Sequence, residues 1–285
     1  MQGKICLVTG ASSGIGKYTA LGLAKQGAHV VLLCRNQEKA DQVRDEIIHF
    51  TGNNKISTLV ADLSSQAQIR DAVREFKKRH KRLDVLINNA GMFSLERKLS
   101  VDNIELTFAV NHLAYFLLTG LLLETLLATP LSRIVNVSSE AHRHTKINFD
   151  DIQGAKVYGG WGAYRQSKLA NILFSYELAR RMPNTNTTVN CLHPGLVATD
   201  LWVDHAGPLG PMVNIVLGKL LKPMMRPSER GADTSIYLAS ATEVAGVTGK
   251  YFIDKVPYQS SPESYDQESA RKLWDLSMEL TKAKK

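Results

Sequence analysis

Residues 5–16 read ICLVTGASSGIG, an apolar run that ends in a glycine-rich turn. The run Ile5–Thr9 is typical of a buried strand, and the turn leads directly into a helical pattern over 14–26. Glycines at such a turn let backbone N–H groups approach a phosphate, and the N-terminus of the helix adds a partial positive charge. Because a strand precedes this turn and a helix follows it, the stretch predicts a dinucleotide-phosphate site rather than an unliganded turn.

Strands and helices alternate along the rest of the chain. Apolar runs predict further strands at 29–34, 56–60, 85–88, 133–137, 187–192 and 251–253. Helical patterns follow at about 37–50, 66–79, 101–128, 164–181 and 228–239. The first five strand runs are continuously apolar, so both faces of the sheet need cover. We therefore predict an α/β fold, a doubly wound parallel sheet of about seven strands with helices on both faces.

The composition predicts one ordinary globular unit. No stretch resembles a linker, so residues 1–285 are expected to form a single domain, with a cofactor half at about 1–130 and a catalytic and substrate half at about 131–285. Lys and Arg number 35 against 27 Asp and Glu, a formal net charge of +8. The basic run 77–82 closes a predicted helix, where cations complement the dipole, and no aromatic interleaving or zinc pattern accompanies it. We expect no nucleic-acid partner.

The cysteines and the N-terminus bear on location. Cys6, Cys34 and Cys191 lie in or beside apolar runs without disulfide-like spacing, which favours a reducing compartment. The first strand begins at about Lys4 and leaves no room for a signal peptide or N-terminal anchor, so we expect a cytoplasmic location. The Leu-rich stretch 113–131 is interrupted by polar residues and predicts a buried helix rather than a transmembrane segment.

The end of the second strand predicts which dinucleotide binds. An acidic residue near this point suits the ribose 2′-hydroxyl of NAD, whereas an arginine accommodates the 2′-phosphate of NADP. Cys34 stands where the acid would be, and Arg35 and Asn36 follow it, so NADP(H) is favoured over NAD(H). Lys17, just inside the first helix, either adds positive potential or is a solvated surface side chain.

A serine, a tyrosine and a lysine form the candidate catalytic set. Tyr164 and Lys168 are four residues apart on a predicted helix and so share one face. A free tyrosine has a pKa near 10, and an adjacent ammonium is expected to lower it toward the operating range. Ser139, after the fifth strand, can hydrogen-bond a reacting carbonyl oxygen. The histidines show no metal-ligand spacing, and we expect no metal site.

With these motifs the chain resembles the short-chain dehydrogenase/reductase family, which has a Rossmann fold, across nearly its whole length. The matching positions are the turn of Gly10, Gly14 and Gly16, then Asp62 and Leu63, Asn88 to Gly91, Asn111, Ser139, Tyr164 with Lys168, and His193, Pro194, Gly195 and Thr199. The resemblance implies a catalytic set of Asn111, Ser139, Tyr164 and Lys168. Ser139 is chosen because the family's catalytic serine is the second of such a pair, and Ser138 is the alternative.

The resemblance also implies cofactor contacts. Asp62 and Leu63 would border the adenine, Asn89, Ala90 and Gly91 would line the cofactor, and Asn111 would support a water-mediated proton relay to Lys168. Lys168 would bind the nicotinamide ribose, while Pro194, Gly195 and Thr199 would hold the carboxamide. The full set of expected cofactor-binding residues is Gly10, Ser12, Ser13, Gly14, Ile15, Gly16, Arg35, Asn36, Asp62, Leu63, Asn89, Ala90, Gly91, Tyr164, Lys168, Pro194, Gly195 and Thr199.

Four further stretches, at 110–116, 137–142, 167–171 and 270–274, resemble the retinol-dehydrogenase-like, or WW-domain-oxidoreductase-like, branch. Animal retinol dehydrogenases of that branch commonly carry an N-terminal membrane anchor, which is not expected here. The family places its variable substrate lid at about 199–228. Apolar residues at helical spacing in this stretch suit a lipophilic substrate roof, a stripe packed on the core, or shallow peripheral membrane contact. Trp161 and Trp202 are candidate pocket walls.

The function expected from these residues is that of an NADP(H)-dependent oxidoreductase. It would interconvert a lipophilic aldehyde or ketone with its alcohol, as a carbonyl reductase does, using Tyr164 as acid or base. A dinucleotide-binding sensor on the same fold is the alternative, but such proteins typically lose the tyrosine or the lysine. An extended-type epimerase would need a larger C-terminal domain. The partner is a small-molecule carbonyl or alcohol, and a homodimer or homotetramer stays open.

Overall fold

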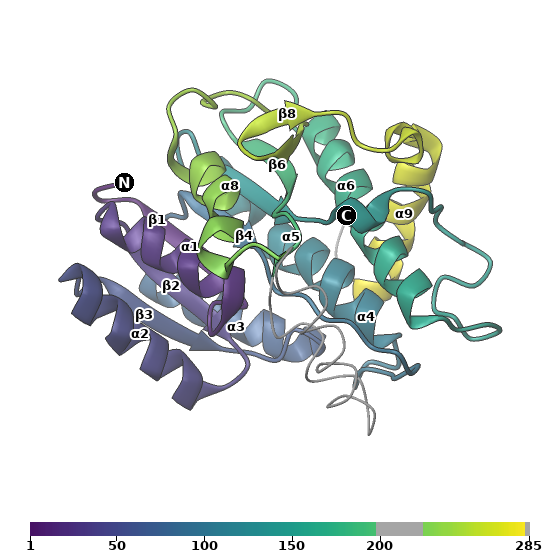
Figure 1. Ribbon diagram of the computed structural model, residues 1–285, viewed down its shortest axis with the longest axis horizontal. Coiled ribbons are helices and arrows are strands. Elements are labelled where there is room, and N and C mark those ends of the chain that lie inside the picture. Colours follow the sequence, from purple (N-terminus) through teal and green to yellow (C-terminus); the bar gives the residue numbers. More distant parts are fainter. Residues whose placement is uncertain (198–224, 283–285) are drawn as a thin grey trace.

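The computed structural model describes residues 1–197 and 225–282. Within these residues eight strands form one sheet in the order β3-β2-β1-β4-β5-β6-β7-β8 (Figure 1). The bounds are β1 Ile5–Thr9, β2 His29–Cys34, β3 Ile56–Val60, β4 Val85–Asn88, β5 Arg133–Val137, β6 Thr188–His193, β7 Tyr251–Ile253 and β8 Val256–Tyr258. Strands β1 to β7 are parallel, and β8 pairs antiparallel with β7. The predicted doubly wound Rossmann sheet is confirmed.

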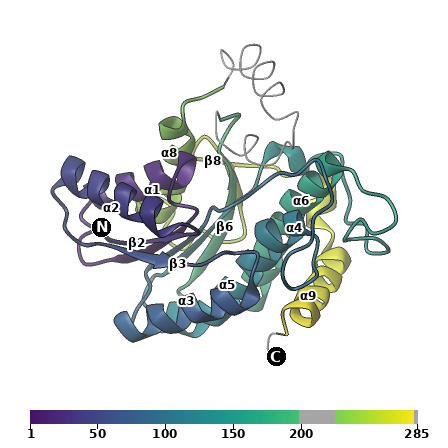
Figure 2. The ribbon, with the colours of Figure 1, turned by 90° about the horizontal axis from the view of Figure 1, so that it is seen from below.

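Helices cover both faces of the sheet, as Figure 2 shows. One face carries α1 (Gly14–Lys25), α2 (Gln37–Thr51) and α8 (Ser228–Ser240). The other face carries α3 (Gln66–Arg79), α5 (Ala114–Leu127) and α6 (Gly160–Arg181), and α9 (Gln267–Thr281) packs on α6. Shorter helices are α4 (Leu106–Phe108), η1 (Ala109–Leu113), η2 (Glu140–His142) and η6 (Pro262–Tyr265).

The strands are apolar on both sides because each side meets helices. In β1, Leu7 joins the core under α3 and α5, whereas Cys6 and Val8 join the core under α1 and α8. Full burial of one such aliphatic side chain stabilises the fold by roughly 1.5–3 kcal/mol. The continuous apolar runs therefore reflect a sheet with two buried faces.

The order of the strands reverses between β1 and β4. The chain builds outward through β2 and β3 on one side of β1, and through β5, β6 and β7 on the other side of β4. Ligands of doubly wound sheets bind outside the carboxyl ends of the strands at such a reversal. The candidate residues of the sequence analysis follow these same strand ends.

The eighth strand was not predicted. Residues Val256–Tyr258 are exposed, contain Pro257 and lie at the edge of the sheet, so they carry little of the apolar signal of the other strands. The turn that leads into them consists of Asp254 and Lys255, both with positive φ (49° and 67°). Hairpin turns of this kind usually contain Asn-Gly or Asp-Gly, and this one has no glycine.

Two helix predictions also need correction, and one helix was not predicted. The helix predicted over 101–128 begins at Leu106, because the buried Glu105 carboxylate accepts hydrogen bonds from the N–H groups of Thr107 and Phe108 and caps it there. The helix predicted from Tyr164 begins at Gly160, whose missing Cβ leaves room for the carbonyl of Ser94. The helix α9 was not predicted, although Asp266 at its N-cap was a readable signal.

Residues Leu106–Leu127 form a continuous helical stretch that is long and apolar enough to cross a membrane. In this structure 72% of its most apolar 18-residue segment is buried inside the protein. Buried core helices have the same length and composition, so this stretch is weak support for a membrane span. The expectation that residues 113–131 contain a buried helix agrees with this packing.

Candidate functional site

The carboxyl ends of six parallel strands bring the candidate residues to one edge of the sheet. These residues are Gly10 after β1, Arg35 after β2, Asp62 and Leu63 after β3, Asn89, Ala90 and Gly91 after β4, Ser139 after β5, and Pro194 and Gly195 after β6. Thr199, most of the expected lid at 199–228 and Trp202 lie outside the described residues. The edge therefore joins residues that are up to 185 positions apart.

The glycine-rich turn is shaped for close backbone approach. Gly10 and Gly14 adopt positive φ (64° and 52°). A Cβ on Gly16 would lie 2.2 Å from the carbonyl oxygen of Gly10, so only glycine fits there. The N-cap of α1, Ser13, makes no side-chain capping hydrogen bond within the described chain, and the first turn contains no acid. Uncapped N–H groups at a helix N-terminus suit an anion, and these residues fit a dinucleotide pyrophosphate.

The N-termini of α2 and α3 differ from that of α1. Asn36 at the N-cap of α2 accepts a hydrogen bond from the N–H of Lys39 at 2.9 Å, and Ser65 caps α3 in the same way. The side-chain oxygen of Asn36 is thus engaged in capping α2. Lys17, whose role was left open, forms a 2.7 Å ion pair with Glu46 of α2. This ion pair partly neutralises the positive charge of Lys17.

The end of β2 offers a neutral buried group followed by an exposed cation. Burial raises the pKa of the Cys34 thiol to about 11, partly offset by contacts with Ala11 and Ser12 of the glycine turn. Cys34 therefore stays uncharged at neutral pH. Arg35, the next residue, is exposed. A 2′-phosphate beside this strand would meet a guanidinium and no carboxylate from residues 34–36.

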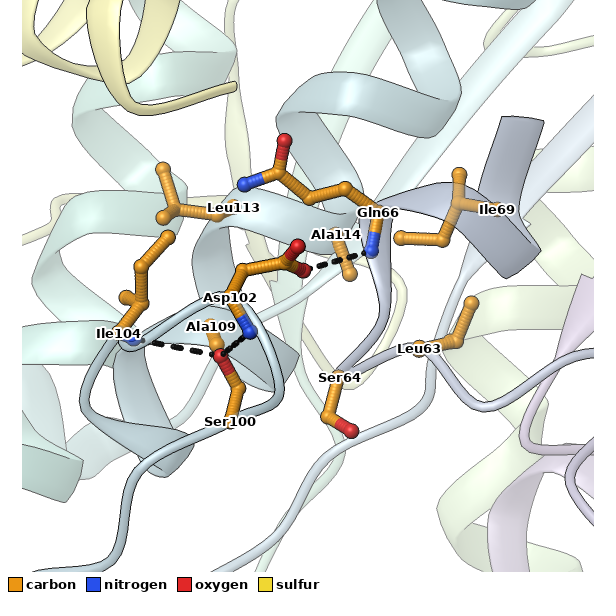
Figure 3. A pocket seen from close by; sticks show the side chains of 10 residues that line it. All are labelled: Leu63, Ser64, Gln66, Ile69, Ser100, Asp102, Ile104, Ala109, Leu113 and Ala114. Atoms are coloured by element: carbon orange, nitrogen blue, oxygen red, sulfur yellow. Dashed lines mark hydrogen bonds between the residues drawn. The ribbon is translucent and has the colours of Figure 1, made fainter. Parts of the chain in front are cut away.

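The segment after β3 lies beside a small recess, shown in Figure 3. Leu63 lines it from one side, and Ala109 and Leu113 of η1 line it from the other. The Asp102 carboxylate accepts a 2.9 Å hydrogen bond from the N–H of Gln66 and closes the start of α3. Asp62 accepts from the N–H of Ser64 at 2.8 Å, which holds the turn after β3 in place.

Thr9 organises the ends of β1 and β4, and the sequence analysis missed it. Its buried hydroxyl oxygen accepts hydrogen bonds from the N–H groups of Asn89 and Ala90, at 2.8 and 3.0 Å. The amide of Asn89 donates back to the carbonyl of Thr9 at 2.9 Å. Tyr115, also missed, donates to the carbonyl of Ala90 at 2.7 Å. The only sequence signal for these hydrogen bonds was a threonine directly before Gly10.

Asn111 lies in η1, a five-residue π-helical segment inside the long apolar helix. Its amide is held by three hydrogen bonds: it accepts from the N–H of Met92 at 2.8 Å and donates to Met92 O and Ser167 Oγ at 2.9 and 3.0 Å. A Cβ on Gly91 would lie 3.5 Å from Asn111 Oδ1 and 3.4 Å from Lys168 Nζ. The segment after β4 therefore lies close to both of these side chains. Single-turn π segments of this kind are frequent at functional sites.

The two serines after β5 have different partners. Ser138 is buried, and its hydroxyl donates to the backbone carbonyl of Lys168 at 2.7 Å. The Ser139 hydroxyl oxygen accepts from the N–H of Ala141 at 3.2 Å, and the Ser139 side chain lies close enough to Tyr164 to lower the pKa of its phenol. Ser138 thus fastens β5 to α6, and Ser139 faces the tyrosine.

Tyr164 and Lys168 are both buried on the inner face of α6. Lys168 Nζ lies 5.6 Å from the centre of the Tyr164 ring and donates to the carbonyl of Val137 at 3.2 Å. Burial raises the pKa of Tyr164 to about 12, against a smaller lowering by the hydrogen bond with Ser139. Burial also lowers the pKa of Lys168 to about 8. The tyrosine pKa was expected to be lowered by the lysine, and it is raised instead, because loss of hydration is the largest influence on Tyr164.

Aromatic rings stand beside the tyrosine. The indole of Trp161 stacks on the ring of Tyr164, with centroids 5.8 Å apart and planes at 17°. Phe93 approaches both rings edge-on at 5.9 Å. Trp161 lies one turn before Tyr164 inside α6, because this helix begins at Gly160 rather than at Tyr164 as predicted. Phe93 and Trp161 thus form an apolar wall beside Tyr164.

The segment after β6 is held from two sides. His193 Nδ1 accepts a hydrogen bond from the N–H of Glu140 at 3.1 Å, and burial lowers the pKa of His193 to about 4. Gly195 has a φ of +88°, and a Cβ there would come within 3.0 Å of the Arg226 side chain. Arg226 in turn pairs with Asp254. Pro194 and Gly195 are thereby placed beside Ser139 and its helix η2.

The described residues contain no group of three or more His, Cys, Asp or Glu side chains that could hold a metal ion. The chemistry of this edge lies instead in hydroxyl, phenol, ammonium and amide groups. Such a set can donate and accept protons and hydrogen bonds around a carbonyl oxygen.

The family model for short chain dehydrogenase matches residues 4–206. Human retinol dehydrogenase 14 is 44% identical over 97% of this chain and 86% of its own length. A crystal structure of an uncharacterized protein from Mycobacterium paratuberculosis is 30% identical, with a TM-score of 0.78, over 99% of this chain and 94% of that one. A short chain dehydrogenase from Shigella flexneri complexed with NADP is 26% identical, with a TM-score of 0.69, over 88% and 97% of the two chains.

Proposed function

Because the chain belongs to the short chain dehydrogenase family, we propose that it is an NADP(H)-dependent oxidoreductase that interconverts a lipophilic aldehyde or ketone with its alcohol. The observation that carries the proposal is the grouping of Ser139, Tyr164 and Lys168: Ser139 influences the phenol, and Lys168 Nζ lies 5.6 Å from the centre of the tyrosine ring. These groups lie at the edge of the sheet that also holds the glycine turn. In this proposal residues 1–285 form one domain.

The chain's own residues account for the movement of the proton. A bound nicotinamide would supply the hydride in reduction and accept it in oxidation. Ser139 donates a hydrogen bond to the carbonyl oxygen and polarises it, and Tyr164 gives the same oxygen a proton. Because burial holds the pKa of Tyr164 at about 12, the phenol is protonated at neutral pH and ready to act as a donor.

Lys168 and Asn111 support this step. The Lys168 ammonium stabilises the phenolate that Tyr164 becomes after giving up its proton, and a pKa of about 8 leaves most of it charged at neutral pH. Asn111, fixed by its three hydrogen bonds, would orient water that returns a proton toward Lys168. Lys168 would also bind the nicotinamide ribose, with the Gly10–Gly16 turn at the pyrophosphate.

The choice of NADP(H) rests on Cys34 and Arg35. The neutral thiol presents no carboxylate to repel a 2′-phosphate, and the exposed guanidinium can pair with it. The structurally similar Shigella flexneri dehydrogenase was crystallised with NADP.

The substrate class follows from the rings of Phe93 and Trp161 beside Tyr164. An apolar wall favours a carbonyl attached to a lipophilic or conjugated body. The similarity to human retinol dehydrogenase 14 makes retinoids the first probes. The three cysteines of the chain are buried free thiols, which suits the cytoplasmic location that belongs to the same proposal.

The test is the rate of NADPH oxidation with retinoid, aliphatic, aromatic and steroid aldehydes and ketones, in the wild type and in Tyr164→Phe. We expect turnover in the wild type and a loss of at least about 100-fold in the variant, since a positioned acid contributes roughly 10²–10⁴-fold. Tyr258→Phe, at an exposed position of β8, is the matched control and should retain activity. NADPH binding without turnover on the whole panel would favour the dinucleotide sensor instead.

A further inference from the structure

His142 is fully buried directly beside the candidate catalytic serine, and both of its ring nitrogens meet backbone groups. Nδ1 lies 2.7 Å from the carbonyl oxygen of Ser139. The N–H of Ser261 donates to Nε2 at 3.0 Å. A carbonyl only accepts and an amide N–H only donates, so these partners require a neutral ring with its proton on Nδ1.

The surroundings of His142 support a neutral ring. Its edge packs against the ring of Tyr251, with centroids 5.1 Å apart. Charged or titratable groups near it are Glu140, Arg143, Glu263 and His193. Burial is the largest influence on His142 and lowers its pKa. The ring therefore remains a donor on one side and an acceptor on the other at neutral pH.

The acceptor side of the ring is attached to a separately anchored segment. Ser260, next to Ser261, shares a 2.8 Å hydrogen bond with Tyr176 of α6. Arg143, next to His142, donates to the carbonyl of Gln259 at 2.8 Å. Residues 259–261 are thus a fixed support, and His142 spans from this support to the backbone of Ser139.

We propose that His142 is a positioning residue, which fixes the Ser139 carbonyl through Nδ1 and so holds the Ser139 hydroxyl toward Tyr164. This role rests on the proposed function, because it matters to catalysis only if Ser139 and Tyr164 carry the reaction. Ser139 is the last residue before the single turn η2 and has an extended backbone. The bond from His142 therefore restrains the residue whose hydroxyl must meet the carbonyl oxygen.

Three variants separate the two hydrogen bonds of the ring. His142→Asn places an amide N–H near the position of Nδ1 and retains the bond to Ser139. His142→Gln reaches the position of Nε2 and retains an acceptor for Ser261, but it leaves Ser139 unbound. His142→Phe preserves the aromatic contact with Tyr251 and removes both hydrogen bonds.

The measurements are kcat, KM for the carbonyl, the NADPH dissociation constant and the melting temperature. We expect kcat to fall about tenfold or more in His142→Phe and His142→Gln, because small misplacements of a reacting group cost up to roughly 100-fold. His142→Asn should retain kcat within about threefold, with NADPH affinity unchanged in all three variants. If His142→Phe does not fold, the comparison of Asn with Gln still decides the question.

A second readout does not depend on activity. The ¹⁵N shifts of the His142 side chain in the protein without cofactor should show a protonated Nδ1 and an unprotonated Nε2. A proton on Nε2 would overturn the proposal. The proposal would also be overturned if the Asn and Gln variants lost kcat equally and in proportion to their loss of melting temperature. Absence of turnover in the wild type would instead overturn the proposed function itself.

Discussion

At the scale of single residues, burial sets the ionisation state of the candidate site more strongly than neighbouring charge does. The pKa of Tyr164 rises to about 12, that of Lys168 falls to about 8, and that of His193 falls to about 4, each with loss of hydration as the main cause. Every shift favours the neutral form, as expected in a site shielded from water. The tyrosine is thereby a proton donor at neutral pH, which matches the reducing direction of the proposed reaction.

The choice of cofactor also belongs to this scale and can be reversed at one position. Arg35→Glu would replace the exposed guanidinium after β2 with a carboxylate that repels a 2′-phosphate. We expect NADPH affinity to fall about 10- to 100-fold, since hydrogen bonds to charged groups contribute roughly 1.5–3 kcal/mol. Fluorescence titration with NADPH and NADH measures the change.

Arg44→Ala is the control for Arg35→Glu. Arg44 is another arginine, on α2, and it already pairs with Asp41 and Asp45. Its loss should leave the preference for NADPH intact. If Arg35→Glu binds NADPH as tightly as the wild type does, Arg35 does not bind the 2′-phosphate.

At the scale of elements, the β1 to α1 turn is tightly packed against the end of β4. Gly10, Gly16 and Asn89 approach one another so closely that a Cβ on Gly16 would lie 2.2 Å from Gly10 O and 2.5 Å from Asn89 Nδ2. The amide of Asn89 is itself bonded to the end of β1. Any side chain at position 16 must therefore displace backbone, and the uncapped start of α1 would move with it.

Gly16→Ala should weaken NADPH binding by at least about tenfold, because the pyrophosphate site is built from the backbone that the new methyl group displaces. Isothermal titration calorimetry with NADPH tests this. Gly120→Ala is the matched control: Gly120 is exposed in α5, and a Cβ there meets no atom within 4 Å among the described residues. The control should bind normally and gain about 0.5–1 kcal/mol in the free energy of unfolding. Equal affinity in both variants would contradict the assignment of the turn.

At the scale of the whole molecule, buried polar side chains connect elements that are far apart in sequence. His112 in η1 is fully buried and hydrogen bonded to Ser277 of α9 at 2.9 Å. Its ring lies against Phe108 and Phe174, with centroids 5.1 and 6.1 Å away. The C-terminal helix is thus bonded to the helical segment that carries Asn111.

This contact makes stability depend on pH. Burial lowers the pKa of His112 to about 3, whereas an unfolded histidine titrates near 6.5. The unfolded chain therefore binds the extra proton first, and stability that is complete above pH 6.5 is lost as the pH falls toward 3. One proton corresponds to about 1.4 kcal/mol per pH unit in the free energy of unfolding.

Urea unfolding at pH 7, 6 and 5 measures this slope. In His112→Phe the loss of stability on acidification should be shallower than in the wild type by about one proton, although the variant also loses the bond to Ser277. His49→Gln, at an exposed position of α2, is the control and should follow the wild type. An unchanged slope in His112→Phe would show that other groups govern the acid response.

The sequence alone predicted the sheet, because buried parallel strands must be apolar on both faces and this requirement is local. Ile5–Thr9 and four later strands were predicted with the bounds that the structure has up to β5. The glycine turn and the Tyr164 and Lys168 pair were readable for the same reason, since their spacing reflects one turn or one helix face. The exposed strand β8 could not be predicted in this way, because no glycine marks the turn before it. The start of the long helix could not be predicted either, because it depends on the Glu105 cap.

Only the tertiary structure decided what depends on contacts between distant segments. It showed that Ser138 bonds to the backbone of Lys168 and that Ser139 lies beside Tyr164, whereas the sequence offered only the resemblance to the family as a ground for choosing between these adjacent serines. It reversed the expected direction of the tyrosine pKa, because burial is a property of the assembled core. The contact of His142 with residue 261 is likewise invisible in the sequence, since the two residues meet only where β5, β7 and the C-terminal segment pack together.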